Sequence, residues 1–322
     1  MVMKARADVQ EDFEITVGWA DSFAEYKLLL QSQNYTAGTI KTTMSVLNKM
    51  RDYCVPLGCS SPTQVTHIHM RKYLAEMHGK YAPAYINGHI SKLRGFYNFL
   101  TEDYMDEWDN PMRKTKFLKN PSKKIIVFND REVAEMIAVA GKQKNKFHAE
   151  RDKLMIQIMA DCGLRVHELV SLQNADVMKD SIFIRNGKGN KQRLVYLTSP
   201  VAKQVVRYVR VRDAYFESKG LQETQMFFRN FRGEPVGNDG VQKMLKRLAL
   251  RCNIRDEVRV SPHSFRHWFA QSQLKNGISI FTLSKLLGHT SISTTQTYLE
   301  GLADEELIAS AIKTSPLLNI KS

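Results

Sequence analysis

Apolar side chains recur every three to four residues through the first third of the chain, which is the spacing of one face of an α-helix. The pattern predicts helices over residues 19–30, 37–53, 68–78 and 83–100. Asn110-Pro111 ends this run, since a residue before proline is disfavoured in helical conformation. The first part of the chain is therefore expected to be an all-helical module.

The second part mixes two periods. Helical spacing returns over residues 130–140, 151–162, 200–219 and 240–252, and again after Pro262. Between them, residues 181–197 alternate apolar and polar positions around a glycine-rich stretch at 186–191, which predicts a β-hairpin. The expected fold class is mainly α with a small β-sheet.

A basic, proline-interrupted segment separates the two parts and lacks apolar periodicity, as interdomain linkers do. The predicted organisation is an N-terminal extension (1–17), a helical domain (18–110), a basic linker (111–125), a second domain of helices with a hairpin (126–302), and a C-terminal helix and tail (303–322).

Size and charge narrow the class of partner. At 322 residues the chain exceeds what one compact core usually takes, so two domains are expected. The formal net charge of +14 and pI near 9.5 favour a polyanionic partner, although charge alone leaves DNA, RNA and an anionic membrane open. The sequence shows neither a signal peptide nor a membrane span, and its four cysteines form no disulfide framework, so an intracellular, cytoplasmic protein is expected.

Arg165 is the first candidate for chemistry. It follows a strongly apolar helix and Gly163, where an unpaired charge would cost several kcal/mol, on the order of a lost buried ion pair. Glu168, three positions on, is a possible partner. A structural ion pair and a site for a bound anion both remain open here.

Two further stretches carry histidine, arginine and tyrosine together. A helix starting at Pro262 would place His263 and Arg266 on one face and turn His267 elsewhere. A short helix should end at Gly288, with His289 directly after it and Tyr298 on a further short helix. Alone, each histidine or tyrosine is more often an ordinary packed residue. Together they form an inventory that can converge on a phosphate without a metal site.

Several basic residues are candidates for DNA contact, with a solvated helix surface as the alternative reading. They are Lys41, Lys92, Arg94, Lys191, Lys243, Lys246 and Arg247.

In their order along the chain, the residues Arg165, Lys188, His263, Arg266, His289 and Tyr298 resemble the tyrosine recombinase family, the integrases and the Xer-like or Cre-like recombinases. The resemblance covers about residues 20–310. It is specific in four blocks: Gly163-Leu164-Arg165 with Glu168-Leu169, Gly187-Lys188-Gly189-Asn190-Lys191, His263-Ser264-Phe265-Arg266-His267, and Leu287-Gly288-His289 with Tyr298. Phe265, Trp268 and Tyr196 depart from the commoner family residues.

This resemblance implies a SAM-like helical core-binding domain and an α/β catalytic domain of the DNA breaking-rejoining fold, together a C-shaped clamp around DNA. Tyr298 would attack a DNA phosphate to form a 3′-phosphotyrosyl bond, with Arg165 and Arg266 clamping the phosphate oxygens. His263 would act as base, Lys188 would protonate the leaving 5′ oxygen, and His289 would hydrogen-bond the phosphate. Neither a cofactor nor a metal is implied.

The implied partners are double-stranded DNA recombination sites, bound two at a time by a homotetramer joined through the C-terminal helix, with accessory DNA-bending proteins as a further candidate. No membrane partner is implied. The role would be integration, excision or transposition of a mobile element, or Xer-like resolution. Two alternatives stay open: a type IB topoisomerase or telomere-resolvase-like enzyme, and a non-catalytic DNA-binding regulator.

Overall fold

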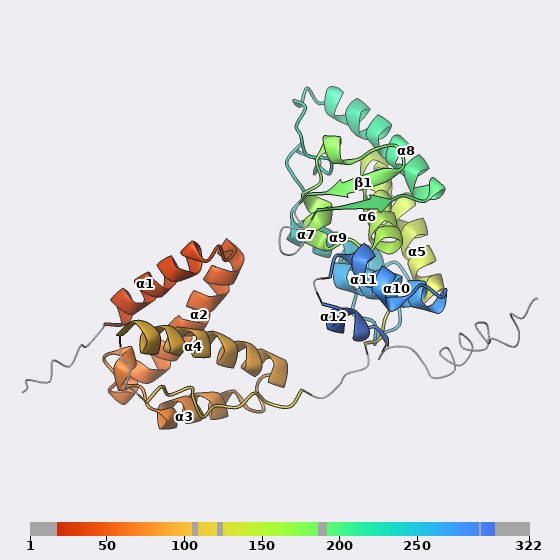
Figure 1. Ribbon diagram of the computed structural model, residues 1–322. Helices are drawn as coiled ribbons and strands as arrows, with labels where there is room; N and C mark the ends of the chain where they lie inside the picture. The colour runs from red at the N-terminus through yellow and green to blue at the C-terminus, as the bar shows by residue number, and fades with distance from the viewer. Residues whose placement is uncertain (1–17, 105–108, 121–124, 186–191, 290, 300–322) are drawn as a thin grey trace, which may run out of the picture. The chain divides into compact units, whose positions relative to one another are not determined.

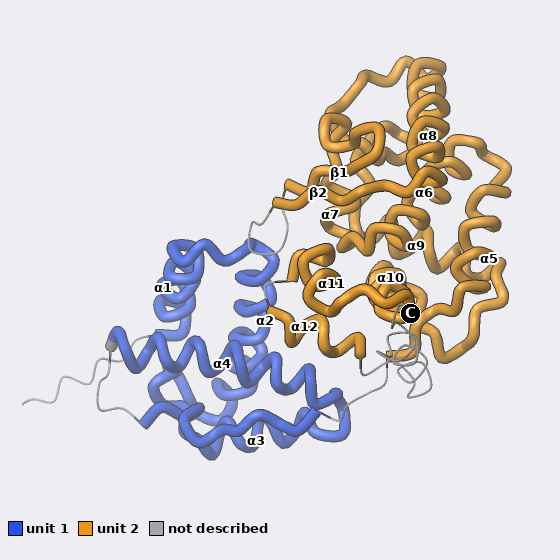
Figure 2. The backbone as a smooth tube through the Cα atoms, turned by 45° about the vertical axis from the view of Figure 1, so that its right-hand side comes forward, with its two compact units in different colours: residues 1–122 blue, residues 123–322 orange. Residues whose placement is uncertain are grey.

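The computed structural model describes residues 18–104, 109–120, 125–185, 192–289 and 291–299 (Figure 1). The chain divides into two compact units, residues 1–122 and 123–322 (Figure 2), each with a hydrophobic core of its own. This division falls within the segment 111–125 that the sequence indicates as a linker. The predicted extension at 1–17 and the C-terminal helix at 303–322 lie outside the described residues.

The described part of the first unit is helical. Its α-helices are α1 (Trp19–Ser32), α2 (Ala37–Cys54), α3 (His67–Met77) and α4 (Pro83–Tyr104), with one-turn 3-10 helices η1 (Val55–Leu57) and η2 (Pro62–Gln64). Thr36 and Thr66 cap α2 and α3 by accepting from the backbone N–H of Thr39 and His69. Leu47, Met50 and Phe96 are fully buried between the helices. The four predicted helices are confirmed.

Part of the predicted linker packs on this first unit. The Asn87 side chain exchanges hydrogen bonds with both backbone groups of Leu118, at 2.8 and 2.9 Å. Arg94 donates to the Thr115 carbonyl at 2.6 Å and lies over the Phe117 ring. These long-range contacts have no periodic signature, so the sequence pattern did not indicate them.

The second unit is mainly helical with one small sheet, which confirms the predicted fold class (Figure 1). Its elements are α5 (Asp130–Gly141), α6 (Lys146–Cys162), α7 (Val166–Val170), η3 (Asn174–Asp176), β1 (Ser181–Ile184), β2 (Arg193–Tyr196), α8 (Ser199–Glu217), α9 (Asn238–Ala249), α10 (Pro262–Lys275), α11 (Ile280–Leu287) and α12 (Ser293–Gln296). The strands are antiparallel, with Ile184 opposite Arg193. Helix α6 is central and packs against α5, α8 and α10.

Two local predictions are wrong. The helix expected over residues 151–162 begins earlier, at Lys146, because Phe147 is buried in the core and Asn145 caps the helix by accepting from the His148 N–H. Tyr298 was expected on a short helix, but it follows the end of α12 in a turn and donates its backbone N–H to Thr295. Within the described part of the chain, no helix has the length and apolar character needed to cross a membrane.

Candidate active site

The turn between α6 and α7 places the first arginine. Gly163 ends α6 with a left-handed backbone at φ 60°, and a Cβ added there would lie 2.4 Å from Cδ1 of Phe269. Arg165 then stands at the N-cap of α7, with its backbone N–H donating to Glu168 Oε2 at 2.9 Å. The glycine therefore sets both the direction of the chain and the position of Arg165.

Glu168 is shared between two arginines. Arg165 Nη1 donates to its Oε1 at 3.0 Å. Arg193, from β2, donates Nη1 to Oε1 at 2.9 Å and Nη2 to Oε2 at 2.8 Å. The ion pair left open for Arg165 therefore exists, but Arg193 holds the carboxylate with the better, bidentate geometry.

This environment keeps Glu168 ionised. Burial by itself would raise the pKa of the Glu168 carboxyl, but the hydrogen bond and charge of Arg193, followed by those of Arg165, bring that pKa down to about 2. The carboxylate therefore carries its charge throughout the neutral pH range.

Helix α10 supplies the second arginine. Pro262 opens the helix, and the Ser261 side chain caps it by accepting from the Ser264 N–H at 3.2 Å. Arg266 is buried and donates Nη1 to the Gly163 carbonyl at 2.6 Å. Burial, followed by the nearby charge of Arg165, lowers the pKa of Arg266 to about 10, so its guanidinium stays protonated at neutral pH.

The C-terminal end of α11 is fastened by three different arginines. The carbonyl of Leu286 accepts from Arg193 Nε at 3.1 Å, that of Leu287 from Arg266 Nη2 at 2.7 Å, and that of Gly288 from Arg165 Nη2 at 3.5 Å. The last carbonyls of a helix lack partners within it and carry partial negative charge, so cations stabilise them. Three arginines thus bind the backbone immediately before His289, and one of them, Arg266, also contacts His289 itself.

His289 bridges the arginines and α12. Its Nε2 lies 2.9 Å from Arg266 Nη2, and its Nδ1 lies 2.8 Å from Oγ1 of the fully buried Thr295. Because a guanidinium can only donate, Nε2 accepts and Nδ1 carries the hydrogen in this arrangement. The imidazole is thus held in one orientation by groups on both sides.

Tyr298 is buried between two imidazole rings, with 4% of its surface exposed. Its ring meets the His267 ring edge-on at a centroid distance of 5.1 Å and lies nearly parallel to the His289 ring at 6.0 Å. Its hydroxyl also lies within electrostatic reach of the Arg266 guanidinium. The expectation that His267 points away from the cluster is therefore wrong.

The other two histidines of the cluster, His263 and His267, are neutral at neutral pH. Burial, followed by the charges of Arg266 and Arg165, lowers the pKa of His263 below its usual value. Burial and the neighbouring His263 lower that of His267 in the same way. Neutral imidazoles can accept a proton, which the chemistry expected of His263 requires.

The structure brings most of the candidate site together. Arg165, Glu168, His263, Arg266, His289 and Tyr298 form one cluster in the second unit, where α10, α11 and α12 meet in Figure 1. Lys188 and Lys191 lie outside the described residues. Sequence reasoning missed Arg193, His267 and Thr295. Arg193 carries no local signal that separates it from Arg185, the other arginine flanking the hairpin tip.

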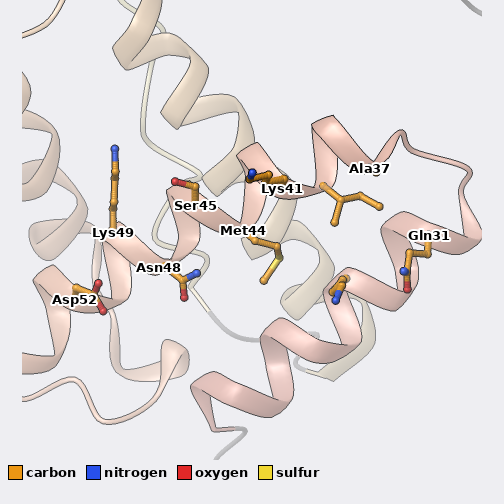
Figure 3. A pocket seen from close by; sticks show the side chains of 10 residues that line it. Gln31, Ala37, Lys41, Met44, Ser45, Asn48, Lys49 and Asp52 are labelled. Atoms are coloured by element: carbon orange, nitrogen blue, oxygen red, sulfur yellow. The ribbon is translucent and has the colours of Figure 1, made fainter. Parts of the chain in front are cut away.

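The candidate DNA contacts differ in how free they are. Lys41 is exposed on α2 and lines an open pocket beside α1, together with Lys49 and Asn48 (Figure 3). Lys243 and Lys246 are exposed on α9.

Three other candidates have partners inside the protein. Arg247 donates to Asp152 and Gln143, and Arg94 holds Thr115 and Phe117. Lys92 Nζ lies 3.4 Å from the Gly88 carbonyl. Arg247 and Arg94 therefore also stabilise contacts within the protein, which the sequence did not indicate.

Comparison with known proteins identifies the family to which the chain is similar. The model of the phage integrase family matches residues 127–305. The tyrosine recombinase XerC of Anoxybacillus flavithermus is 29% identical over 279 residues, covering 86% of this chain and 90% of the relative. XerC of Halalkalibacterium halodurans is 29% identical over 288 residues, covering 87% and 91%.

Solved structures agree on the fold. The XerH recombinase bound to its palindromic difH substrate in a post-cleavage complex has a TM-score of 0.71, with 19% identity, covering 91% of this chain and 84% of that one. The Tn1549 transposon integrase in complex with a circular intermediate DNA has a TM-score of 0.68, with 16% identity, covering 92% and 99%. Because the family model spans more than half of the chain, this protein belongs to the phage integrase family and is a tyrosine recombinase, an enzyme of site-specific DNA recombination.

Proposed function

We propose that this recombinase cuts and rejoins double-stranded DNA through a covalent 3′-phosphotyrosyl bond to Tyr298. The observation that carries the proposal is the packing of the Tyr298 ring against the ring of His289, whose Nε2 is bonded to Arg266, inside a cluster that also contains Arg165. A phenol in such a cluster can meet a phosphate that the same cations bind.

The chemistry follows from charge and proton balance. As the Tyr298 oxygen attacks phosphorus, negative charge grows on the non-bridging oxygens. Arg165 and Arg266, which both donate to the end of α11, are our candidates to stabilise that charge. A phenol loses its proton with a pKa near 10, so a neighbouring acceptor is needed at neutral pH. Neutral His263 is our candidate acceptor.

His289 is our candidate donor to the phosphate. In the structure, Nε2 of His289 accepts from Arg266. When Arg266 turns to a phosphate, the Thr295 hydroxyl can donate to Nδ1 instead of accepting from it, and Nε2 then carries the hydrogen. The buried threonine thus permits the tautomer that a phosphate ligand requires.

The bonds balance without an external energy source. The O–P bond to Tyr298 forms as the bond to the 5′ oxygen breaks, leaving a free 5′ hydroxyl whose later attack restores the DNA backbone. Lys188, which the family resemblance assigns to protonation of that oxygen, is our candidate acid. We further propose that a homotetramer acts on two DNA sites, at the ends of a mobile element or at an Xer-like resolution site. The similarity to XerC proteins and to the Tn1549 integrase fold supports both kinds of site.

A nicked duplex carrying a site recovered by binding selection tests the proposal. The expected result is an SDS-resistant protein–DNA adduct that Tyr298→Phe abolishes. Tyr215→Phe is the matched control, because the Tyr215 hydroxyl lies 3.4 Å from the Phe231 carbonyl, outside the cluster. Binding without an adduct would indicate a regulator. An adduct with relaxation of supercoils but no exchange between two marked sites would indicate a topoisomerase.

A further inference from the structure

We propose that Arg193 is a positioning residue for DNA cleavage, which holds Glu168 so that Arg165 stays available to the phosphate and fixes the end of α11 beneath His289. The proposal rests on the proposed function and adds a residue that carries out no bond chemistry itself.

The contacts of Arg193 are all internal. Its Nη1 and Nη2 donate to the two oxygens of Glu168, and its Nε donates to the Leu286 carbonyl at 3.1 Å. Its side chain is 11% exposed, whereas that of Arg165 is 21% exposed. Each of the three side-chain nitrogens of Arg193 therefore has an acceptor within the protein, and the side chain is less exposed to a phosphate than that of Arg165.

Arg165 and Arg193 compete for the carboxylate of Glu168. Its Oε1 accepts from Arg165 and Arg193 together, and its side chain is 2% exposed. A buried carboxylate that loses one cation draws more strongly on the other, because an unpaired buried charge is costly. Without Arg193, Glu168 would take Arg165 as a bidentate partner and offset the charge that the phosphate needs.

Arg193 also packs against the backbone that carries His289. A Cβ added to Gly288 would lie 3.1 Å from Arg193 Nη1 and 3.3 Å from its Cδ, and Gly288 has a φ of 63°. Only glycine combines that conformation with so close an approach. The arginine, the glycine and the end of α11 therefore form one support for His289.

A displacement of about 1 Å in such a support can slow chemistry roughly 10²-fold. We expect Arg193→Gln to lower the single-turnover rate of adduct formation on the nicked duplex by about that factor, with DNA affinity unchanged. Arg185→Gln is the matched control, since Arg185 flanks the same hairpin and pairs with the buried carboxylate of Asp176. This control should cleave at the wild-type rate.

Removing the charge of Glu168 distinguishes a positioning role of Arg193 in cleavage from a role in the stability of the fold. Under the proposal, the double variant Arg193→Gln with Glu168→Gln cleaves faster than Arg193→Gln alone, because no carboxylate is left to capture Arg165, but slower than Glu168→Gln alone, because the end of α11 still lacks its bond from Arg193. If Arg193 only stabilised the fold, the corrected rate of Arg193→Gln would equal that of wild type, and the corrected rate of the double variant would equal that of Glu168→Gln. Rates are divided by the adduct yield at completion, which removes any unfolded fraction from the comparison.

Arg193→Lys covers the case in which the glutamine variants fail to fold. Lysine keeps a cation beside Glu168 but cannot hold both oxygens and Leu286 together, so a rate between those of wild type and Arg193→Gln is expected. A wild-type rate in Arg193→Lys, or in Arg193→Gln, overturns the role of Arg193. Cleavage that survives Tyr298→Phe instead overturns the proposed function, so the two failures are distinguishable.

Discussion

Arg266 donates its Nη2 to Nε2 of His289 across 2.9 Å, and this bond determines which imidazole nitrogen carries the hydrogen. On the other side of the ring, Nδ1 meets the Thr295 hydroxyl at 2.8 Å. A hydroxyl can donate or accept, whereas a guanidinium can only donate. Thr295 therefore allows the hydrogen of His289 to move from Nδ1 to Nε2 when a phosphate takes the place of His289 as the partner of Arg266.

Removing that hydroxyl is expected to slow cleavage. Thr295→Val keeps the buried shape but leaves Nδ1 without a donor, so the Nε2–H tautomer loses its support. We expect adduct formation to fall about 10- to 100-fold, the usual effect of losing a supporting hydrogen bond to an active-site histidine. The measurement is the single-turnover rate on nicked DNA. Thr297→Val, at an exposed threonine bonded only locally to the Thr294 carbonyl, should have the wild-type rate.

Gly163 is expected to be the more sensitive of two glycines with the same backbone conformation. Gly163 and Gly220 have φ of 60° and 63°, but a Cβ would clash with Phe269 at the first and meet nothing within 4 Å at the second. Both alanine variants incur the left-handed strain of roughly 1–2 kcal/mol. Gly163→Ala should lose about 1–3 kcal/mol more, from overpacking.

Urea unfolding of the two variants measures this difference. Because the Gly163 carbonyl accepts from Arg266, the Gly163→Ala variant should also cleave more slowly than Gly220→Ala. Equal losses of stability in the two variants would contradict the close contact with Phe269.

Acid should destabilise the second unit partly through Glu168. Its pKa is about 2 in the folded protein and about 4.3 in an unfolded chain. A depressed carboxyl pKa stabilises the folded state fully above the unfolded value, and this contribution disappears as pH falls from about 4.3 towards 2. It is on the order of 3 kcal/mol at neutral pH.

The contribution of the Glu168 charge to the free energy of unfolding is measured by unfolding Glu168→Gln and wild type in urea at several pH values between 7 and 3. The stability difference between the two should shrink steadily on the acid side of about pH 4.3. Glu217→Gln, at an exposed position on α8, provides the control for a carboxylate outside the cluster. A difference that stays constant with pH would mean that the charge of Glu168 is not what stabilises the fold.

Much of the architecture could be predicted because its signals are local. Apolar spacing located the helices of both units, and Pro262 and Gly288 marked helix ends where the structure has them. The hairpin was visible from its alternation, and strands β1 and β2 pair as expected. The joint occurrence of arginine, histidine and tyrosine indicated the site because each motif lies at a helix end, where side chains meet a neighbouring element.

The features that escaped prediction depend on contacts between distant residues. Arg193 reaches Glu168 and Leu286, which lie 25 and 93 residues away, and nothing local distinguishes it from Arg185. His267 faces Tyr298 because of where the turn after α12 lies, which helical spacing in α10 does not determine. Arg247 is similar, because its acceptor Asp152 lies on another helix.

Two basic residues of α9 are expected to have different functions: Arg247 stabilises the fold, and Lys243 is free to contact DNA. Asp152 is fully buried and accepts from Arg151, Gln143 and Arg247, with Arg247 Nη2 at 3.0 Å. Arg247→Gln should therefore destabilise the fold by roughly 1–2 kcal/mol, a modest value because the Arg247 side chain is half exposed. Lys243→Gln should leave stability unchanged, because that side chain is exposed on the same helix.

DNA binding should be affected by Lys243→Gln more than by Arg247→Gln, the reverse of the effects on stability. If Lys243 contacts a phosphate, its neutralisation releases about one fewer counterion, and the slope of log affinity against log salt falls by about 0.9. Titration of the selected site at several salt concentrations measures this slope, with Lys219→Gln, an exposed lysine after α8, as the control. A slope that changes in Arg247→Gln but not in Lys243→Gln would instead mean that Arg247 leaves Asp152 to bind the DNA backbone.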